Sequence, residues 1–280
     1  MAAPIKFLCP RWGFEDIPWD TFLNQVKEEG FSGIEWFPFG EPGELGDYLK
    51  VLELLQQHEL DFAIVMAVIE PYTTFDGYVK KLAADLDQLM QIRTEAKAPL
   101  FFSAQIGREF FKEDQIIACL ALCQELEDQY KTPIYQETHR NKWSYAAHVV
   151  VPILQKEPTL KLTFDVSHWF CVSESYLADQ QDAVDEVIKH TKHIHARVGS
   201  TQSSQVWDPA NVEYTEALSA HVAIWDRWIA QMRSSSQPIT ITPEFGPAPY
   251  LVKGNRTGSL QDEQWRINVW MKDFLKNRYC

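Results

Sequence analysis

The chain has 280 residues, of which 45% are hydrophobic and 23% are charged. This length and composition are those of a globular protein with a full core, and they exclude a disordered chain. The formal net charge of −13 argues against a nucleic-acid binder or a polybasic membrane anchor, because both normally carry a basic face.

The sequence shows neither a membrane segment nor a secretory signal. Its longest apolar run, Phe62–Ile69, is far shorter than the roughly 20 residues that a transmembrane helix needs. The first residues lack a long apolar region behind a basic one. The five cysteines are odd in number and fit no common zinc or redox spacing. We therefore expect a protein of the reducing cytoplasm with no membrane partner.

Short apolar runs alternate with longer amphipathic segments along the whole chain. In chain order, the sequence predicts strands at Ile5–Cys9, Gly33–Trp36, Asp61–Ala67, Pro99–Gln105, Pro133–Glu137, Leu160–Val166, Lys192–Val198 and Pro238–Glu244. Each strand is followed by a predicted helix, at Trp19–Glu29, Glu44–Gln57, Phe75–Thr94, Glu113–Gln129, Tyr145–Gln155, Leu177–Lys189, Val212–Met232 and Gln261–Leu275.

Eight such units predict an α/β protein with one (β/α)₈ TIM barrel that spans residues 1–280. Helices between strands imply parallel pairing, and eight units at this length favour closure of the sheet. The alternative is an open doubly wound sheet. Its glycine-rich turn is missing after the first strand, where Pro10-Arg11-Trp12-Gly13 stands. No P-loop and no linker that would split the chain is found.

Polar side chains end the last four predicted strands. They are Glu137, Asp165, His195 and Glu244. The active site of such a barrel lies at the carboxyl ends of its strands, and side chains alternate between the two faces of a strand. Because the outer face packs on helices, we expect these four side chains to converge inside the barrel. Two glutamates, an aspartate and a histidine suit one divalent ion, Mn²⁺, Mg²⁺, Co²⁺ or Zn²⁺.

Taken alone, each of these residues has a plainer interpretation, as a solvated charge or a hydrogen-bonded polar group. Their shared position at four successive strand ends favours the metal site. Of two candidate histidines, His195 lies nearer the carboxyl end than His193, so we prefer His195 as the ligand and place His193 behind it. His168 stands three residues after Asp165, where it reaches the substrate or the metal.

Other side chains near the strand ends suit a sugar. Trp12 and Trp169 offer aromatic faces, and Gln105 offers an amide to a hydroxyl group. Packing in the core or at the rim is at least as good an interpretation of each tryptophan. The segment Gly199–Pro209 is polar, rich in small residues and follows a ligand strand directly. It is predicted to be a mobile lid, with a plain surface loop as the alternative.

Several motifs resemble those of one family. ETHR at Glu137, FDVSHW around Asp165 and His168, HIHARVG around His195, and PEFG at Glu244 resemble the xylose isomerase-like TIM barrels, the sugar phosphate isomerase/epimerase superfamily. The early segment GFSGIEWFP is similar to the second strand of that group. The resemblance extends over essentially the whole chain. It implies a divalent metal held by these two glutamates, the aspartate and His195, with the glutamates as the acid–base pair.

The resemblance also implies substrate contacts from His168 and from an arginine after the seventh strand. Arg197 is the candidate, although it follows His195 by only two residues, closer than in a typical ketose 3-epimerase. Phosphorylation of the sugar stays open. So does the choice of Glu137 or Glu244 as the base.

We therefore expect a metal-dependent isomerase or epimerase of a small sugar or sugar-like ketose, which acts through an enediolate next to a polarised carbonyl. One alternative is a polyol dehydratase, a lyase that needs the same metal and base. A second is an apurinic endonuclease, which would need three zinc ions and histidines that the strands Asp61–Ala67 and Pro99–Gln105 lack. A third is a catalytically silent sugar-binding barrel. We expect no nucleic-acid partner and leave a homo-oligomer open.

Overall fold

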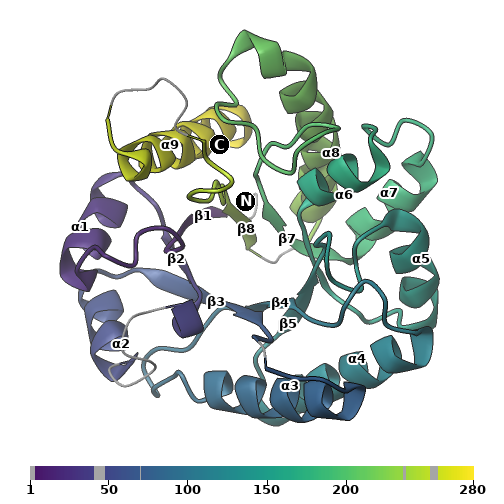
Figure 1. Cartoon of the computed structure of the whole chain (residues 1–280). Coiled ribbons are helices and arrows are strands. Elements are labelled where there is room, and N and C mark those ends of the chain that lie inside the picture. Colours follow the sequence, from purple (N-terminus) through teal and green to yellow (C-terminus); the bar gives the residue numbers. More distant parts are fainter. Residues whose placement is uncertain (1–3, 41–47, 70, 236–237, 253–257) are drawn as a thin grey trace.

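Eight parallel strands close into a barrel in the order of the chain (Figure 1). The structure is a computed structural model that describes residues 4–40, 48–69, 71–235, 238–252 and 258–280. The strands are β1 (Ile5–Pro10), β2 (Gly33–Trp36), β3 (Asp61–Ala67), β4 (Phe102–Gln105), β5 (Ile134–Glu137), β6 (Leu162–Phe164), β7 (Thr191–His195) and β8 (Ile239–Thr242). Pairing of β1 with β8 closes the ring, with Lys6 opposite Thr240. The predicted (β/α)₈ barrel is confirmed.

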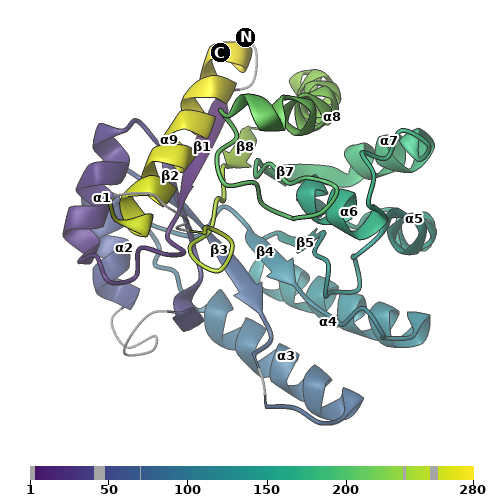
Figure 2. The ribbon, with the colours of Figure 1, turned by 45° about the horizontal axis from the view of Figure 1, so that its top comes forward.

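Helices surround the barrel, and Figures 1 and 2 both place the last of them beside the first. They are α1 (Trp19–Glu28), α2 (Tyr48–Gln57), α3 (Phe75–Met90), α4 (Glu113–Tyr130), α5 (Ala147–Lys156), α6 (Val166–Ser173), α7 (Gln181–His190), α8 (Thr215–Arg233) and α9 (Leu260–Tyr279). The start of the predicted helix Glu44–Gln57 lies outside the described residues. In the part of the chain that the structure describes, we find no helix with the length and apolar character to cross a membrane.

The amphipathic pattern explains how the helices dock. In α1, Phe22, Leu23 and Val26 are fully buried on the side that faces the barrel. The strands are covered on both faces, and every residue of β2 and β8 is buried. This is the usual reason that strands of a parallel sheet form nearly continuous apolar runs. Polar residues within these runs are therefore the exceptions that need partners.

A helix follows β6 directly, where the sequence predicts the end of a strand. Instead of extending to Val166, β6 ends at Phe164, and α6 begins at Val166. Asp165 is the N-cap, because its Oδ1 accepts a hydrogen bond of 2.9 Å from the Ser167 N–H. An aspartate at this position satisfies a backbone donor that the helix leaves unpaired. His168 therefore lies in the first turn of a helix.

The last two strands also end earlier than the sequence predicts. β7 ends at His195 and β8 at Thr242, so Arg197 and Glu244 project from the loops beyond them. Glu244 has a φ of 56°, in the left-handed region. Such a conformation costs a residue with a side chain about 1–3 kcal/mol and is concentrated at functional sites.

Candidate metal and substrate site

A cavity of about 210 Å³ opens at the carboxyl ends of the strands. Its lining includes three carboxylates, from Glu35, Glu137 and Glu244. It also includes, from among the predicted substrate contacts, Trp12, Gln105 and Arg197. The rest of the lining is largely apolar or aromatic, a mixture that is typical of small-molecule sites.

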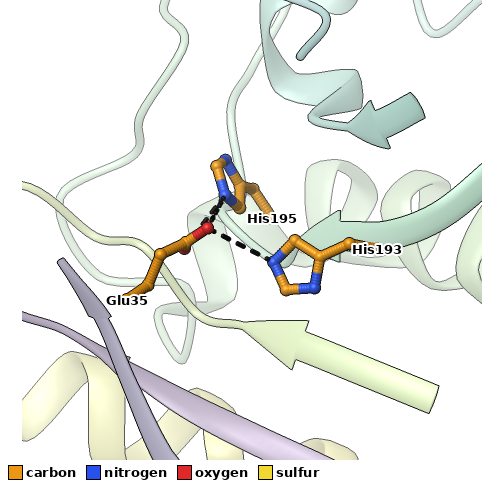
Figure 3. Close-up of side chains that lie close together, drawn as sticks. All are labelled: Glu35, His193 and His195. Atoms are coloured by element: carbon orange, nitrogen blue, oxygen red, sulfur yellow. Dashed lines mark hydrogen bonds and ion pairs between the residues drawn. The ribbon is translucent and has the colours of Figure 1, made fainter. Parts of the chain in front are cut away.

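One buried imidazole lies among the three carboxylates. Nε2 of His195 is 3.1 Å from Oε1 of Glu35, and the two side chains face one another (Figure 3). On the other side of the ring, Nδ1 is 3.0 Å from Oε2 of Glu244 and 3.7 Å from Oε1 of Glu137. His195 is completely buried, and none of the three glutamates is more than 6% exposed. Three acidic groups are thus concentrated around one ring.

The electrostatics of this group favour a positive charge at its centre. Burial alone would lower the pKa of His195, but Glu244, Glu35 and Glu137 outweigh burial and raise this pKa well above the usual range. Burial would likewise raise the pKa of Glu35, yet its contact with His195 lowers that pKa to about 2. Glu35 therefore stays ionised, and this group of acidic residues attracts a cation.

Three of the predicted ligands fit a divalent ion. Nδ1 of His195 and Oε2 of Glu244 are buried and make no hydrogen bond, although they are 3.0 Å apart. Two ligand atoms about 2.1 Å from an ion and at right angles to one another would be about 3 Å apart. Glu137, His195 and Glu244 offer ligand atoms that all lie within 4.8 Å of one another. A shared cation would satisfy both atoms, which face each other without a hydrogen bond.

Asp165, the fourth predicted ligand, has other partners. Its Oδ2 accepts a hydrogen bond of 2.5 Å from Nη2 of Arg197, and its Oδ1 accepts two from Ser167. The same Nη2 of Arg197 is 3.6 Å from Oε2 of Glu244. The guanidinium thus lies between Asp165 and the other three residues. The four side chains converge on one region, but in this arrangement only three share a centre.

Two predicted substrate contacts, Gln105 and His193, instead contact the glutamates of the site. Gln105 donates from Nε2 to both carboxylate oxygens of Glu137, at 3.0 and 3.1 Å. His193 is fully buried beneath His195, where its Nε2 is 3.7 Å from Glu35 and its ring nitrogens contact the hydroxyl groups of two threonines. Burial lowers the pKa of His193 to about 3, so this ring is neutral.

The two remaining predictions concern His168 and Trp169. His168 is fully buried, contacts two arginines, and forms with Glu137 and His139 a further group whose possible ligand atoms lie within 4.8 Å of one another. Trp169, on α6, is directed into the core; its Nε1 donates to the Ser144 carbonyl, and it is absent from the cavity lining. Its helical position, which the sequence does not indicate, turns the indole away from the site.

Glu35 is the main residue that the sequence analysis does not assign. The signal was present, because Glu35 is the one charged residue in the predicted strand Gly33–Trp36 and stands near its carboxyl end. Arg140 and Tyr250 were also missed. They lie in loops, where side-chain alternation gives no direction.

The segment Gly199–Pro209, predicted to be a lid, makes hydrogen bonds to neighbouring parts of the structure. Gln205 accepts from the Gly246 N–H at 2.8 Å and donates to its carbonyl at 3.2 Å. Val206 donates its N–H to the Val198 carbonyl at 2.8 Å. The segment therefore packs on the loop after β8, and its mobility stays a prediction.

No family model and no curated protein matches the sequence, whereas solved structures match over nearly its full length. The probable 3-DHS dehydratase AsbF of Bacillus anthracis is 18% identical, with 98% of this chain and 99% of that chain covered and a TM-score of 0.64. A xylose isomerase domain containing protein of Salmonella typhimurium is 17% identical, with 96% and 97% covered and a TM-score of 0.64. The IOLI protein, with a bound zinc atom, is 14% identical, with 98% and 99% covered and a TM-score of 0.64.

Other matching structures include a D-psicose 3-epimerase and an endonuclease IV. At such low identities the likeness shows the fold. The chain has the xylose isomerase-like TIM-barrel fold, as its motifs predict.

Proposed function

We propose that the chain is a divalent-metal-dependent isomerase or epimerase of a small sugar or sugar-like ketose. The observation that carries this proposal is the group formed by Glu137, His195 and Glu244, with two buried ligand atoms that make no hydrogen bond. A bound ion would supply Lewis-acid polarisation of a carbonyl and its neighbouring hydroxyl. Mn²⁺, Mg²⁺, Co²⁺ and Zn²⁺ all suit this set of oxygen and nitrogen donors.

The protein itself would hold and move the proton. Glu137 and Glu244 reach the cavity from β5 and from the loop after β8, so a substrate between them meets a carboxylate from two sides. One removes the proton next to the carbonyl and the other returns it. Gln105 fixes the orientation of Glu137 through both of its oxygens. Return to the same carbon gives epimerisation, and return to the neighbouring carbon gives isomerisation.

A second candidate is the elimination of water from a polyol. It would use the same metal and the same carboxylates, and the likeness to the probable dehydratase AsbF favours it. We do not propose a nucleic-acid substrate, since the net charge is −13 and the cavity is lined by three carboxylates.

Exchange of hydrogen with solvent tests this proposal. The protein is freed of metal, reloaded with each of the four ions, and incubated in D₂O with a panel of ketoses and polyols that NMR follows. We expect deuterium to enter a ketose only when metal is present, and to be lost in Glu137→Gln and Glu244→Gln. Glu125→Gln, at an exposed site on α4, is the matched control. Exchange at the wild-type rate in both site variants would remove these glutamates from the reaction.

A further inference from the structure

Two arginines meet one buried imidazole at the side of the cavity. Nη1 of Arg140 is 3.0 Å from Nδ1 of His168, and Nη2 of Arg197 is 2.7 Å from Nε2 of the same ring. Tyr250 completes the group, because its hydroxyl accepts a hydrogen bond of 2.8 Å from Nη2 of Arg140. We call Arg140, His168, Arg197 and Tyr250 the arginine corner.

The arginine corner has more donors than acceptors. A guanidinium only donates hydrogen bonds, and a neutral imidazole has one nitrogen that accepts. Burial and the nearby cations lower the pKa of His168 well below its usual range, so its ring is neutral. It can therefore accept from Arg140 or from Arg197, but not from both. One arginine N–H therefore faces the N–H of the His168 ring and finds no acceptor there.

Arg140 brings a positive charge that no carboxylate among the described residues pairs with. Asp165 pairs with Arg197. The acceptors of Arg140 are the His168 ring, the Ser204 hydroxyl at 2.7 Å and the Tyr250 hydroxyl, all of which are neutral. No ion pair with a carboxylate is found for Arg140 among these residues. Arg197 also lies 3.6 Å from Glu244, so Arg140 is the arginine of the corner for which the described residues offer no ion pair.

The corner opens into the cavity next to the proposed proton-transfer group. Arg197 and Tyr250 belong to the cavity lining, whereas Arg140 and His168 do not and contact the lining through Tyr250 and Arg197. The Tyr250 ring stacks near both guanidiniums, with its centroid 5.1 Å from Cζ of Arg140 and 5.2 Å from Cζ of Arg197. Nη2 of Arg197 is 3.6 Å from Oε2 of Glu244. A ligand group held here would lie close to the reacting part of the substrate.

We propose that the arginine corner binds a carboxylate of the substrate, so that the protein acts on a small sugar acid and not on a neutral sugar. The carboxylate supplies the acceptors that the corner lacks, and its planar pair of oxygens matches the fork of a guanidinium. Its single negative charge matches the single charge of Arg140, which has no carboxylate partner among the described residues. A phosphate ester, with about −1.5 to −2 charges at neutral pH, would exceed it. The reaction rests on the proposed function, whereas binding of the acid does not.

Calorimetric titration of the metal-loaded protein tests the proposal with matched pairs. 2-Keto-D-gluconate is paired with D-fructose, and D-glucuronate with D-glucose, because the members of each pair differ mainly at one terminal carbon. D-Fructose 6-phosphate represents the phosphate group. We expect at least one acid to bind about 10-fold or more tightly than its neutral partner, which is the usual scale of a hydrogen bond to a charged group.

Variants test whether the arginine corner causes the preference for an acid over its neutral partner. Arg140→Gln should weaken the acid about 10-fold or more and leave the neutral sugar unchanged. Tyr250→Phe, a gentler change, should weaken the acid by a smaller factor. Arg227→Gln is the control, since Arg227 pairs with Asp185 on the outside of the barrel. Circular dichroism checks that each variant is folded.

The outcomes separate this proposal from the proposed function. If neither acid binds more tightly than its neutral partner, if the phosphate binds best, or if Arg140→Gln weakens acid and neutral sugar alike, the carboxylate assignment is overturned. Deuterium exchange into D-fructose without any preference for acids would support the proposed function and overturn only this inference. Tight, Arg140-dependent binding of an acid without exchange into any compound would support this inference and overturn the proposed function.

Discussion

Replacement of Glu35 should weaken metal binding although Glu35 is not one of the three proposed ligands. Oε1 of Glu35 accepts from Nε2–H of His195 at 3.1 Å, which leaves Nδ1 of that ring free to face Glu137 and Glu244. A carboxylate behind a ligand histidine sets both its tautomer and its orientation. Loss of such a partner typically costs about 10- to 100-fold in metal affinity, which is about 1.4–2.7 kcal/mol.

Two substitutions at this position separate charge from hydrogen bonding. Glu35→Gln keeps an oxygen that accepts from Nε2–H, so its loss of affinity should lie at or below the low end of this range. Glu35→Ala leaves the N–H buried without a partner and should reach the high end. Competition with a chromophoric chelator measures the affinity for Zn²⁺ or Mn²⁺, with Glu125→Ala as the control.

Wild-type affinity in a folded Glu35→Ala protein would refute this reasoning. A much larger loss, equal in Glu35→Gln and Glu35→Ala, would show that Glu35 is itself a ligand. The structure allows for that comparison, since Glu35, His193 and His195 also offer ligand atoms within 4.8 Å of one another.

Three further predictions concern residues that support the site. Gln105→Leu should lower kcat about 10-fold or more at saturating metal, because it releases Glu137; an unchanged kcat would contradict the role. Burial lowers the pKa of His221 to about 4, against 6.5 for the free side chain, so the unfolded chain binds a proton that the folded protein does not as pH falls from 6.5 to 4. This proton should lower the free energy of unfolding by about 3 kcal/mol over that range, and His221→Gln should remove this part of the pH dependence, as urea titrations at several pH values would show. Gln205→Ala removes both hydrogen bonds to Gly246 and should speed amide hydrogen exchange in 199–209; unchanged rates would argue against a lid.

The strand–helix pattern was enough to predict the barrel, because each unit has its own local signal. Apolar runs such as Asp61–Ala67 mark strands that are buried on both faces, and the structure has that strand with the same bounds. Glu137 was predicted at the end of its strand, and β5 ends there; His195 was predicted inside Lys192–Val198, and β7 ends at this residue. Because all eight strands are parallel, one end of the barrel collects their carboxyl termini, so the region of the site follows from the order of the elements.

What the sequence could not provide is the choice of partners beyond the strand ends. The assignment of Asp165 to the metal stays a prediction, and in the structure this residue caps α6 and pairs with Arg197. Both choices satisfy a buried carboxylate, and they differ only in how the loops after β6 and β7 turn. Arg140 is a similar case. It comes to His168 from another loop, and no periodicity relates residues 28 positions apart.

The position of a bound ion tests the central claim most directly. Crystals grown with Mn²⁺ are measured at the manganese absorption edge, so that anomalous scattering locates the metal without assumptions about its ligands. The account predicts one strong peak in the barrel, about 2.0–2.3 Å from Nδ1 of His195 and in contact with Glu137 and Glu244. No peak at saturating Mn²⁺, or a peak remote from His195, would contradict it.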